Sequence, residues 1–171
     1  MNGKAAPLGA CAIALAALAA CSDSAMPGKL LGNYAVAGQS KTNTCGLGAP
    51  DPWNFDVQLS QQGSLLYWSW QDGTALVSGT LGAQQQASLK TSGKANADST
   101  DAGLGPCTLQ RDEDLEITLA SGSPPPSFGG TITYSFTPTA GSQCGDQLTG
   151  GGGQYMQLPC TVSYTVAAKR Q

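Results

Sequence analysis

The chain contains no histidine, and this absence excludes several kinds of site at once. Without an imidazole there is no Ser-His-Asp or Cys-His nucleophile, no His-ligated zinc and no haem held by a proximal histidine. Serines are plentiful, but none lies in a Gly-x-Ser-x-Gly motif that would expose it as a nucleophile. We therefore expect a protein that is not an enzyme and that holds no metal or cofactor.

Charged residues are scarce, at 11% of the chain, against about 25% in average soluble domains. All 11 acidic residues follow residue 21, whereas 7 of the 8 basic residues do so, because Lys4 precedes it. Nucleic-acid binding normally requires clustered Lys and Arg, and this chain has no such cluster. We therefore expect no nucleic-acid partner.

Long apolar runs are also absent, and the one apolar segment, residues 8–20, is shorter than the roughly 20 residues that span a bilayer. Lys4 precedes this segment and small residues end it, which is the pattern of an export signal. A plain secretory signal and an apolar N-terminal core helix are the alternative interpretations. Cys11 lies inside the segment and would be lost on cleavage.

The segment ends in Leu18-Ala19-Ala20-Cys21, which resembles the lipobox of bacterial lipoproteins. The resemblance implies that residues 1–20 are a signal peptide and that Cys21, acylated with palmitate-like chains, becomes the first mature residue. Several acyl chains make a stable anchor, because each buried CH₂ contributes about 0.8 kcal/mol. The resemblance implies a lipid-anchored cell-envelope protein. Ser22 stands where Asp favours inner-membrane retention in Gram-negative members, so in a Gram-negative envelope the resemblance favours the outer membrane.

The remaining chain divides into a short polar tether, residues 21–29, and one domain, residues 30–171. Gly (23) and Pro (10) are frequent enough to predict many turns and few long helices. From residue 30 apolar residues alternate with polar ones, which is typical of antiparallel strands with one buried face. The alternating sets are Tyr34/Val36, Phe55/Val57/Leu59, Leu66/Trp68/Trp70, Leu115/Ile117/Leu119, Ile132/Tyr134/Phe136 and Val162/Tyr164/Val166, with weaker strands over Leu76–Leu81 and Ala87–Ala95.

About eight strands in sequence order predict an all-β meander that closes into an up-and-down barrel, with a β-sandwich as the second choice. The Asp72-Gly73 pair predicts a hairpin. Gly32-Asn33-Tyr34 at the first strand resembles the opening of lipocalin-like barrels. Asn43-Thr44-Cys45, Asp51-Pro52-Trp53 and the run from Leu158 to Tyr164 resemble elements of myxobacterial lipoproteins, a resemblance that implies no activity.

Four cysteines follow the signal: Cys45, Cys107, Cys144 and Cys160. An even number in an oxidising envelope predicts two disulfides, and the preferred pairing is Cys144–Cys160 with Cys45–Cys107. A four-thiolate zinc site is the alternative, but zinc ligands usually come in close Cys-x₂₋₄-Cys pairs, which are absent here.

Acidic residues suggest two further sites. Asp112, Asp114 and Glu116 share one strand face, which predicts a solvated surface and, as an alternative, a calcium contact. A second alternative is an envelope-polysaccharide hydrolase that uses paired carboxylates near tryptophans. Its candidate residues are Asp51, Asp56 and Asp72, near Trp53, Trp68 and Trp70.

The aromatic residues give the best candidate for a ligand site. Inside a closed barrel, Trp68, Trp70, Tyr134 and Tyr164 would either line a cavity or fill it. An open cavity predicts a binding module for a small apolar ligand or an envelope component. A filled core predicts a purely structural or interaction lipoprotein, and an exposed apolar patch would favour that alternative.

Overall fold

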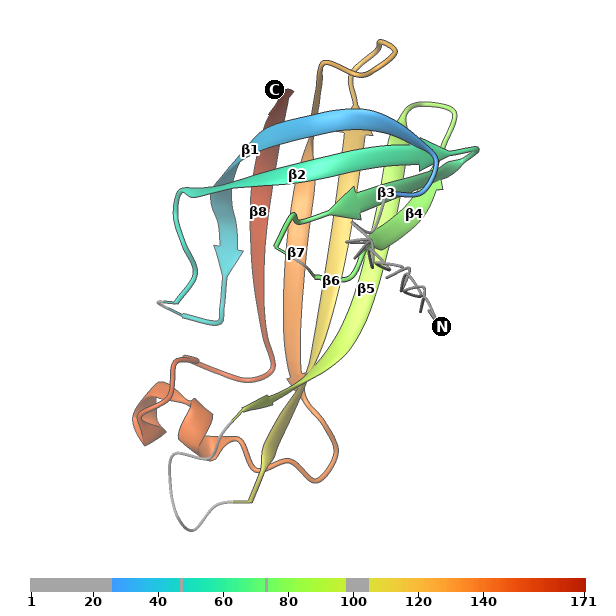
Figure 1. Cartoon of the computed structure of the whole chain (residues 1–171). Coiled ribbons are helices and arrows are strands. Elements are labelled where there is room, and N and C mark those ends of the chain that lie inside the picture. Colours follow the sequence, from blue (N-terminus) through green and yellow to red (C-terminus); the bar gives the residue numbers. More distant parts are fainter. Residues whose placement is uncertain (1–25, 47, 73, 98–104) are drawn as a thin grey trace, which may run out of the picture.

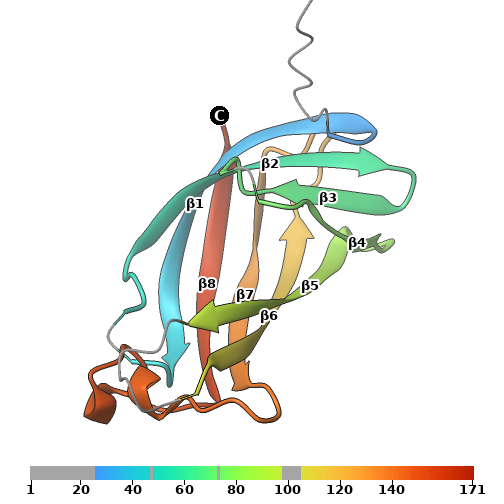
Figure 2. The same ribbon diagram turned by 60° about the horizontal axis from the view of Figure 1, so that its bottom comes forward.

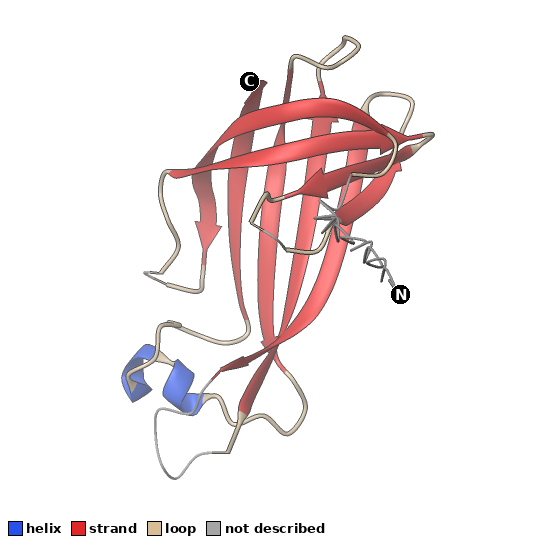
Figure 3. Ribbon diagram, viewed as in Figure 1, coloured by secondary structure: helices blue, strands red, loops and turns tan. Residues whose placement is uncertain are grey.

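The computed structural model describes residues 26–46, 48–72, 74–97 and 105–171. Eight antiparallel strands follow one another in sequence order, and the last pairs with the first, so that the sheet closes into a barrel (Figures 1 and 3). The predicted up-and-down barrel is therefore confirmed, and the sandwich is not formed. The strands are β1 (Lys29–Asn43), β2 (Trp53–Gln62), β3 (Leu65–Ser69), β4 (Val77–Leu81), β5 (Gln86–Ala97), β6 (Cys107–Leu119), β7 (Ser127–Pro138) and β8 (Cys160–Arg170).

Each alternating set from the sequence lies on a separate strand, except that Trp70 falls just after β3. The connection between β3 and β4 is longer than expected. The Asp72-Gly73 pair predicts a tight hairpin, whereas the described residues 70–72 and 74–76 lie outside the two strands. Gln71 has a φ of 59°, and the N–H of Thr74 donates to the Asp72 carboxylate at 2.9 Å. Asp72 thus organises a wider loop, as Asp side chains do in Asx turns. Gly73 lies outside the described residues.

One end of the barrel is filled by packed side chains. Tyr34 and Trp68 are fully buried there, and the rings of Tyr34 and Phe128 lie 5.3 Å apart. The Tyr34 hydroxyl donates to the carbonyl of Pro125 at 2.8 Å, which ties the β6–β7 loop across this end. The start of β1 and the C-terminus lie here, opposite the long β7–β8 loop shown in orange in Figure 2. We call this the closed end and the other the mouth.

The wall of the barrel is incomplete between β4 and β5. These strands pair only over Gly79–Leu81 and Ala87–Leu89, although β5 continues to Ala97 alongside β6. Their backbones approach so closely that a Cβ at Gly79 would lie 2.0 Å from the carbonyl oxygen of Ser88. Glycine is needed here because any side chain would collide with backbone. Beyond Leu89 the wall opens toward the β3–β4 loop.

Two disulfides join Cys45 to Cys160 and Cys107 to Cys144, with Cα–Cα distances of 4.9 and 4.8 Å. The presence of two disulfides is confirmed, but the preferred pairing, Cys45–Cys107 with Cys144–Cys160, is wrong. The reason is barrel closure: β1 pairs with β8, so a cysteine just after β1 lies beside one at the start of β8. Both bonds lie at the mouth.

The N-terminal segment carries the predicted signal and lipidation site, and residues 1–25, including Cys21, lie outside the described residues. Of the predicted tether, residues 26–29 are described; residues 26–28 precede β1, and Lys29 already belongs to it. The Ser60 hydroxyl donates to the carbonyl of Pro27 at 2.7 Å, and Gly28 lies against the backbone of Gln61. This part of the chain therefore already rests on β2. No helix within the described ranges is both long and apolar enough to cross a membrane.

Candidate functional site

Two pockets lie toward the mouth of the barrel and share one wall. The mouth pocket, of about 340 Å³, is bounded by β7, β8 and the loops that follow β1 and precede β8. The side pocket, of about 330 Å³, lies where the wall opens between the β3–β4 loop and β5. Trp53, Arg111 and Tyr134 line both pockets and form the wall between them.

Aromatic rings dominate the mouth pocket. Trp53 stands at the start of β2, and its ring centroid lies 4.8 Å from that of Tyr164 and 5.9 Å from that of Tyr134. Phe136 and Tyr155, 5.7 Å apart, complete the lining from β7 and the β7–β8 loop. Such rings bury much apolar area at small conformational cost, so the pocket is suited to an apolar or aromatic ligand.

The four aromatic residues predicted for a ligand pocket lie at two depths. Trp70 lines the side pocket, Tyr164 lines the mouth pocket and Tyr134 lines both. Trp68 lines neither, because it lies one layer deeper, fully buried between Trp70, at 5.1 Å, and Phe128, at 5.5 Å. Thus the predicted set combines three pocket residues with one core residue.

The shared wall carries a polar group that was not among the site residues predicted from the sequence. The Arg111 guanidinium lies over the Tyr134 ring, 4.8 Å from its centroid, and 3.5 Å from the Glu113 carboxylate. The Tyr134 hydroxyl donates to the same carboxylate at 3.3 Å. Only 5% of Glu113 is exposed, and buried carboxylates require such partners. The three side chains therefore form one polar cluster on an aromatic wall.

The electrostatics of this cluster follow from burial. Burial raises the pKa of Glu113, while the Arg111 charge and the Tyr134 hydroxyl oppose that rise. Burial also raises the pKa of Tyr134, so its hydroxyl stays protonated and remains a donor. At the edge of the side pocket, hydrogen bonds from Thr74 lower the pKa of Asp72, which is therefore ionised at neutral pH.

A signal for Glu113 was present in the alternation of β6. The interior face of β6 carries Leu115, Ile117 and Leu119. Continuing this alternation toward the N-terminus places Glu113 and Arg111 on the same face. Asp112, Glu113 and Asp114 are adjacent and form one acidic run in the sequence. Successive strand residues face opposite sides, so this run splits between the surface and the pocket.

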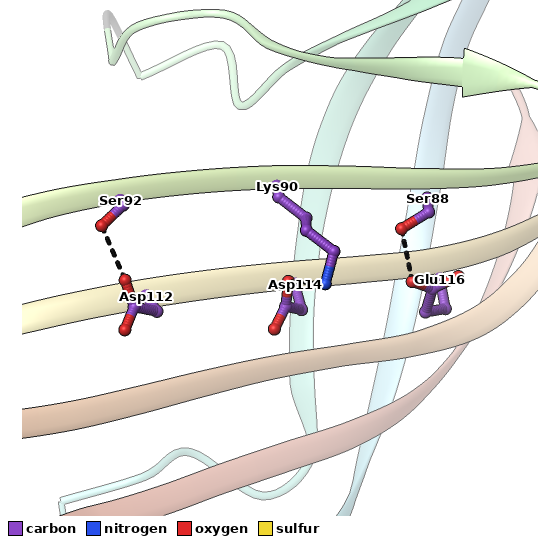
Figure 4. A network of polar contacts seen from close by, with 6 residues as sticks. All are labelled: Ser88, Lys90, Ser92, Asp112, Asp114 and Glu116. Carbon is purple, nitrogen blue, oxygen red and sulfur yellow. Dashed lines mark hydrogen bonds and ion pairs between the residues drawn. The ribbon is translucent and has the colours of Figure 1, made fainter.

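The outward-facing carboxylates of β6 form a regular ladder with β5 (Figure 4). Asp112 accepts from Ser92 at 2.6 Å, Asp114 pairs with Lys90 at 2.7 Å and Glu116 accepts from Ser88 at 2.5 Å. Each carboxylate thus has its own cross-strand partner, as expected for a solvated strand face rather than for convergence on one calcium ion. No group of three or more metal-ligating residues occurs within the described ranges.

The carboxylates considered for a hydrolase lie apart. Asp51 accepts weakly from the Ser40 N–H at 3.4 Å in the β1–β2 loop, and Asp56 accepts from the Gln171 side chain at 2.8 Å on the outer face of β2. Of the three, Asp72 alone lines one of the two pockets near the mouth.

Comparison of the chain with protein-family models, curated proteins and solved structures finds no match.

Proposed function

We propose that this protein is a non-enzymatic, lipid-anchored binding module of the cell envelope, whose mouth pocket holds a small apolar ligand or an apolar part of an envelope component. The observation that carries the binding proposal is the aromatic pocket of about 340 Å³ at the mouth of a barrel whose opposite end is filled by packed side chains. A purely structural barrel would gain stability by filling this space, because packed interiors avoid voids.

Its boundaries also support binding. The disulfide between Cys45 and Cys160 fixes the two loops that border the mouth pocket, and the N–H of Met156 donates to the Cys45 carbonyl at 2.6 Å. Preformed pockets lose less entropy on binding than flexible ones. A rigid rim around aromatic walls is therefore favourable for holding a small molecule.

The mouth pocket can be tested with the neutral fluorophore N-phenyl-1-naphthylamine and a blocking substitution at Gly48. A Cβ at Gly48 would meet only the Gln154 side chain, at 4.0 Å, so a large residue fits there and points at the pocket. In the full chain carrying Cys21→Ser, which cannot be acylated, we expect the fluorophore to bind. Gly48→Trp should weaken binding by about tenfold or more, equivalent to about 1.4 kcal/mol.

The matched control is Gly150→Trp, which adds the same side chain at an exposed glycine outside both pockets. It should leave the affinity unchanged. Absence of fluorophore binding, or equal loss in both variants, would contradict the proposed mouth-pocket function.

The lipid anchor is tested by the intact mass of the membrane-extracted protein. We expect a chain that begins at Cys21 and carries acyl groups. Reduction should add about four hydrogens, two for each of the disulfides Cys45–Cys160 and Cys107–Cys144. A mass without lipid, or one that starts elsewhere, would overturn the assignment of Cys21.

A further inference from the structure

The side pocket differs from the mouth pocket in its charge, although the two share Trp53, Arg111 and Tyr134. Arg111 is the charged residue of the mouth pocket, whereas the side pocket adds the carboxylates of Asp72 and Glu113. Glu113 pairs with Arg111 at 3.5 Å; burial raises the pKa of Glu113, and this ion pair opposes the rise. Asp72, exposed at the rim and without a cation at salt-bridge distance in the described chain, leaves the side pocket with one unmatched negative charge.

The walls beside this charge are aromatic faces. The rings of Trp53 and Trp70 lie 5.8 Å apart and close to parallel, with an interplanar angle of 27°, and Tyr134 adds a third ring. The face of an aromatic ring attracts cations, and tryptophan does so most strongly. Aromatic faces together with a carboxylate are the surroundings that suit a weakly hydrated organic cation, since a strongly hydrated metal ion requires several oxygen ligands.

The side pocket also has an open entry. Gly93, opposite Arg111 on β6, lines the pocket, and a Cβ placed on it would meet no atom within 4 Å. The pairing of β4 with β5 ends at Leu89, so no neighbouring strand of the described chain covers this part of β5. A small ligand can therefore reach the pocket through the side of the barrel.

From these features we infer that the side pocket binds a small organic ammonium cation, seated against Trp53 and Trp70 with its charge facing Asp72. This is a second site, separate from the apolar mouth pocket of the proposed function. Thr74 fixes the orientation of the Asp72 carboxylate by donating its N–H at 2.9 Å. The Arg111 guanidinium lies over Tyr134 and pairs with Glu113, beyond salt-bridge distance of Asp72. The pKa of Asp72 is lowered first by the Thr74 hydrogen bonds and only last by the Arg111 charge.

The test uses choline and its neutral carbon analogue, 3,3-dimethylbutan-1-ol, which has the same shape without the charge. Binding to the full chain carrying Cys21→Ser is measured at pH 7.5 and low salt by calorimetry and by tryptophan fluorescence. We expect choline to bind at least tenfold more tightly than the alcohol, and increasing salt should weaken choline binding. Equal binding of both compounds, or no choline binding at millimolar concentration, would overturn the inference.

Two pairs of variants locate the site. Asp72→Asn should weaken choline binding about fivefold to tenfold, whereas Asp56→Asn, on the outer face of β2, should not change it. Gly93→Phe should abolish choline binding by filling the pocket, whereas Gly150→Phe should not. Because Asp72 is exposed, its substitution does not threaten folding. An unchanged affinity in Asp72→Asn would overturn the inference.

The naphthylamine measurement separates the two proposals. Gly93→Phe should retain binding of the apolar fluorophore in the mouth pocket while losing choline. Gly48→Trp should show the opposite pattern. Loss of choline binding in both variants would mean that the cation occupies the mouth pocket, which would also overturn the assignment to the side pocket.

Discussion

Replacing both Cys45 and Cys160 by alanine is expected to lower the free energy of unfolding by about 5 kcal/mol, and this is the largest effect that we predict. The bond joins residues separated by 115 positions, so it restricts most of the unfolded chain. The Cys107–Cys144 bond spans 37 positions, and its removal should cost about 4 kcal/mol by the same chain-entropy argument. Chemical denaturation of the oxidised proteins measures both values.

The two disulfides should differ more in their effect on ligand binding than in their effect on the free energy of unfolding. Cys45 belongs to the mouth pocket, whereas Cys107 and Cys144 do not. Loss of the Cys45–Cys160 bond should therefore free the rim loops and weaken N-phenyl-1-naphthylamine binding under conditions where the variant is still folded. Replacing Cys107 and Cys144 should leave that affinity unchanged. Equal effects on fluorophore affinity would show that the first bond has no special role at the pocket.

The second large effect concerns Trp68, whose substitution by alanine should destabilise the protein by about 3–5 kcal/mol. Its side chain is fully buried, so truncation leaves a large cavity between its neighbouring aromatic rings. Its indole N–H has no acceptor within the described part of the chain. An unsatisfied buried donor costs about 1–3 kcal/mol. Trp68→Phe would remove this donor, and with it the cost, while keeping an aromatic ring in the core.

Trp68→Phe should therefore cost far less than Trp68→Ala, about 1 kcal/mol or below, because relief of the unsatisfied N–H offsets lost contacts. Thermal and urea unfolding would compare the two variants. Trp53→Ala, at the partly exposed pocket wall, is the control and should cost less than Trp68→Ala while weakening fluorophore binding. A phenylalanine variant as unstable as the alanine variant would show that the N–H imposes no penalty.

The strands were predictable because a meander depends on local patterns. In each strand, alternation reveals which side chains face inward, and each strand pairs with its neighbours in sequence. The pairing of β8 with β1 is the exception, since no local pattern specifies a contact between the first and last strands. The cysteine pairing was predicted wrongly for the same reason, because Cys45 and Cys160 meet only when β8 pairs with β1 and the barrel closes.

The candidate site was predictable in part. Alternation gives the face of a residue but not its depth along the barrel axis, so Trp68 and Trp70 appeared equivalent. The structure separates them because β3 ends at Ser69, leaving Trp70 at the edge of the pocket. The cluster of Arg111, Glu113 and Tyr134 combines β6 with β7, and the register that places Glu113 opposite Tyr134 is a tertiary property. The side opening depends likewise on the short pairing of β4 with β5.

The direction of β1 has a consequence for where a ligand must come from. This strand of 15 residues starts at the closed end and finishes beside the mouth, a path of at most about 50 Å at 3.3 Å per residue. With Cys21 acylated as proposed, the membrane attachment joins the barrel at the end farthest from the mouth pocket. The mouth would then face the aqueous compartment. A ligand would be captured from solution or from a facing surface, and not drawn sideways from the leaflet that holds the anchor.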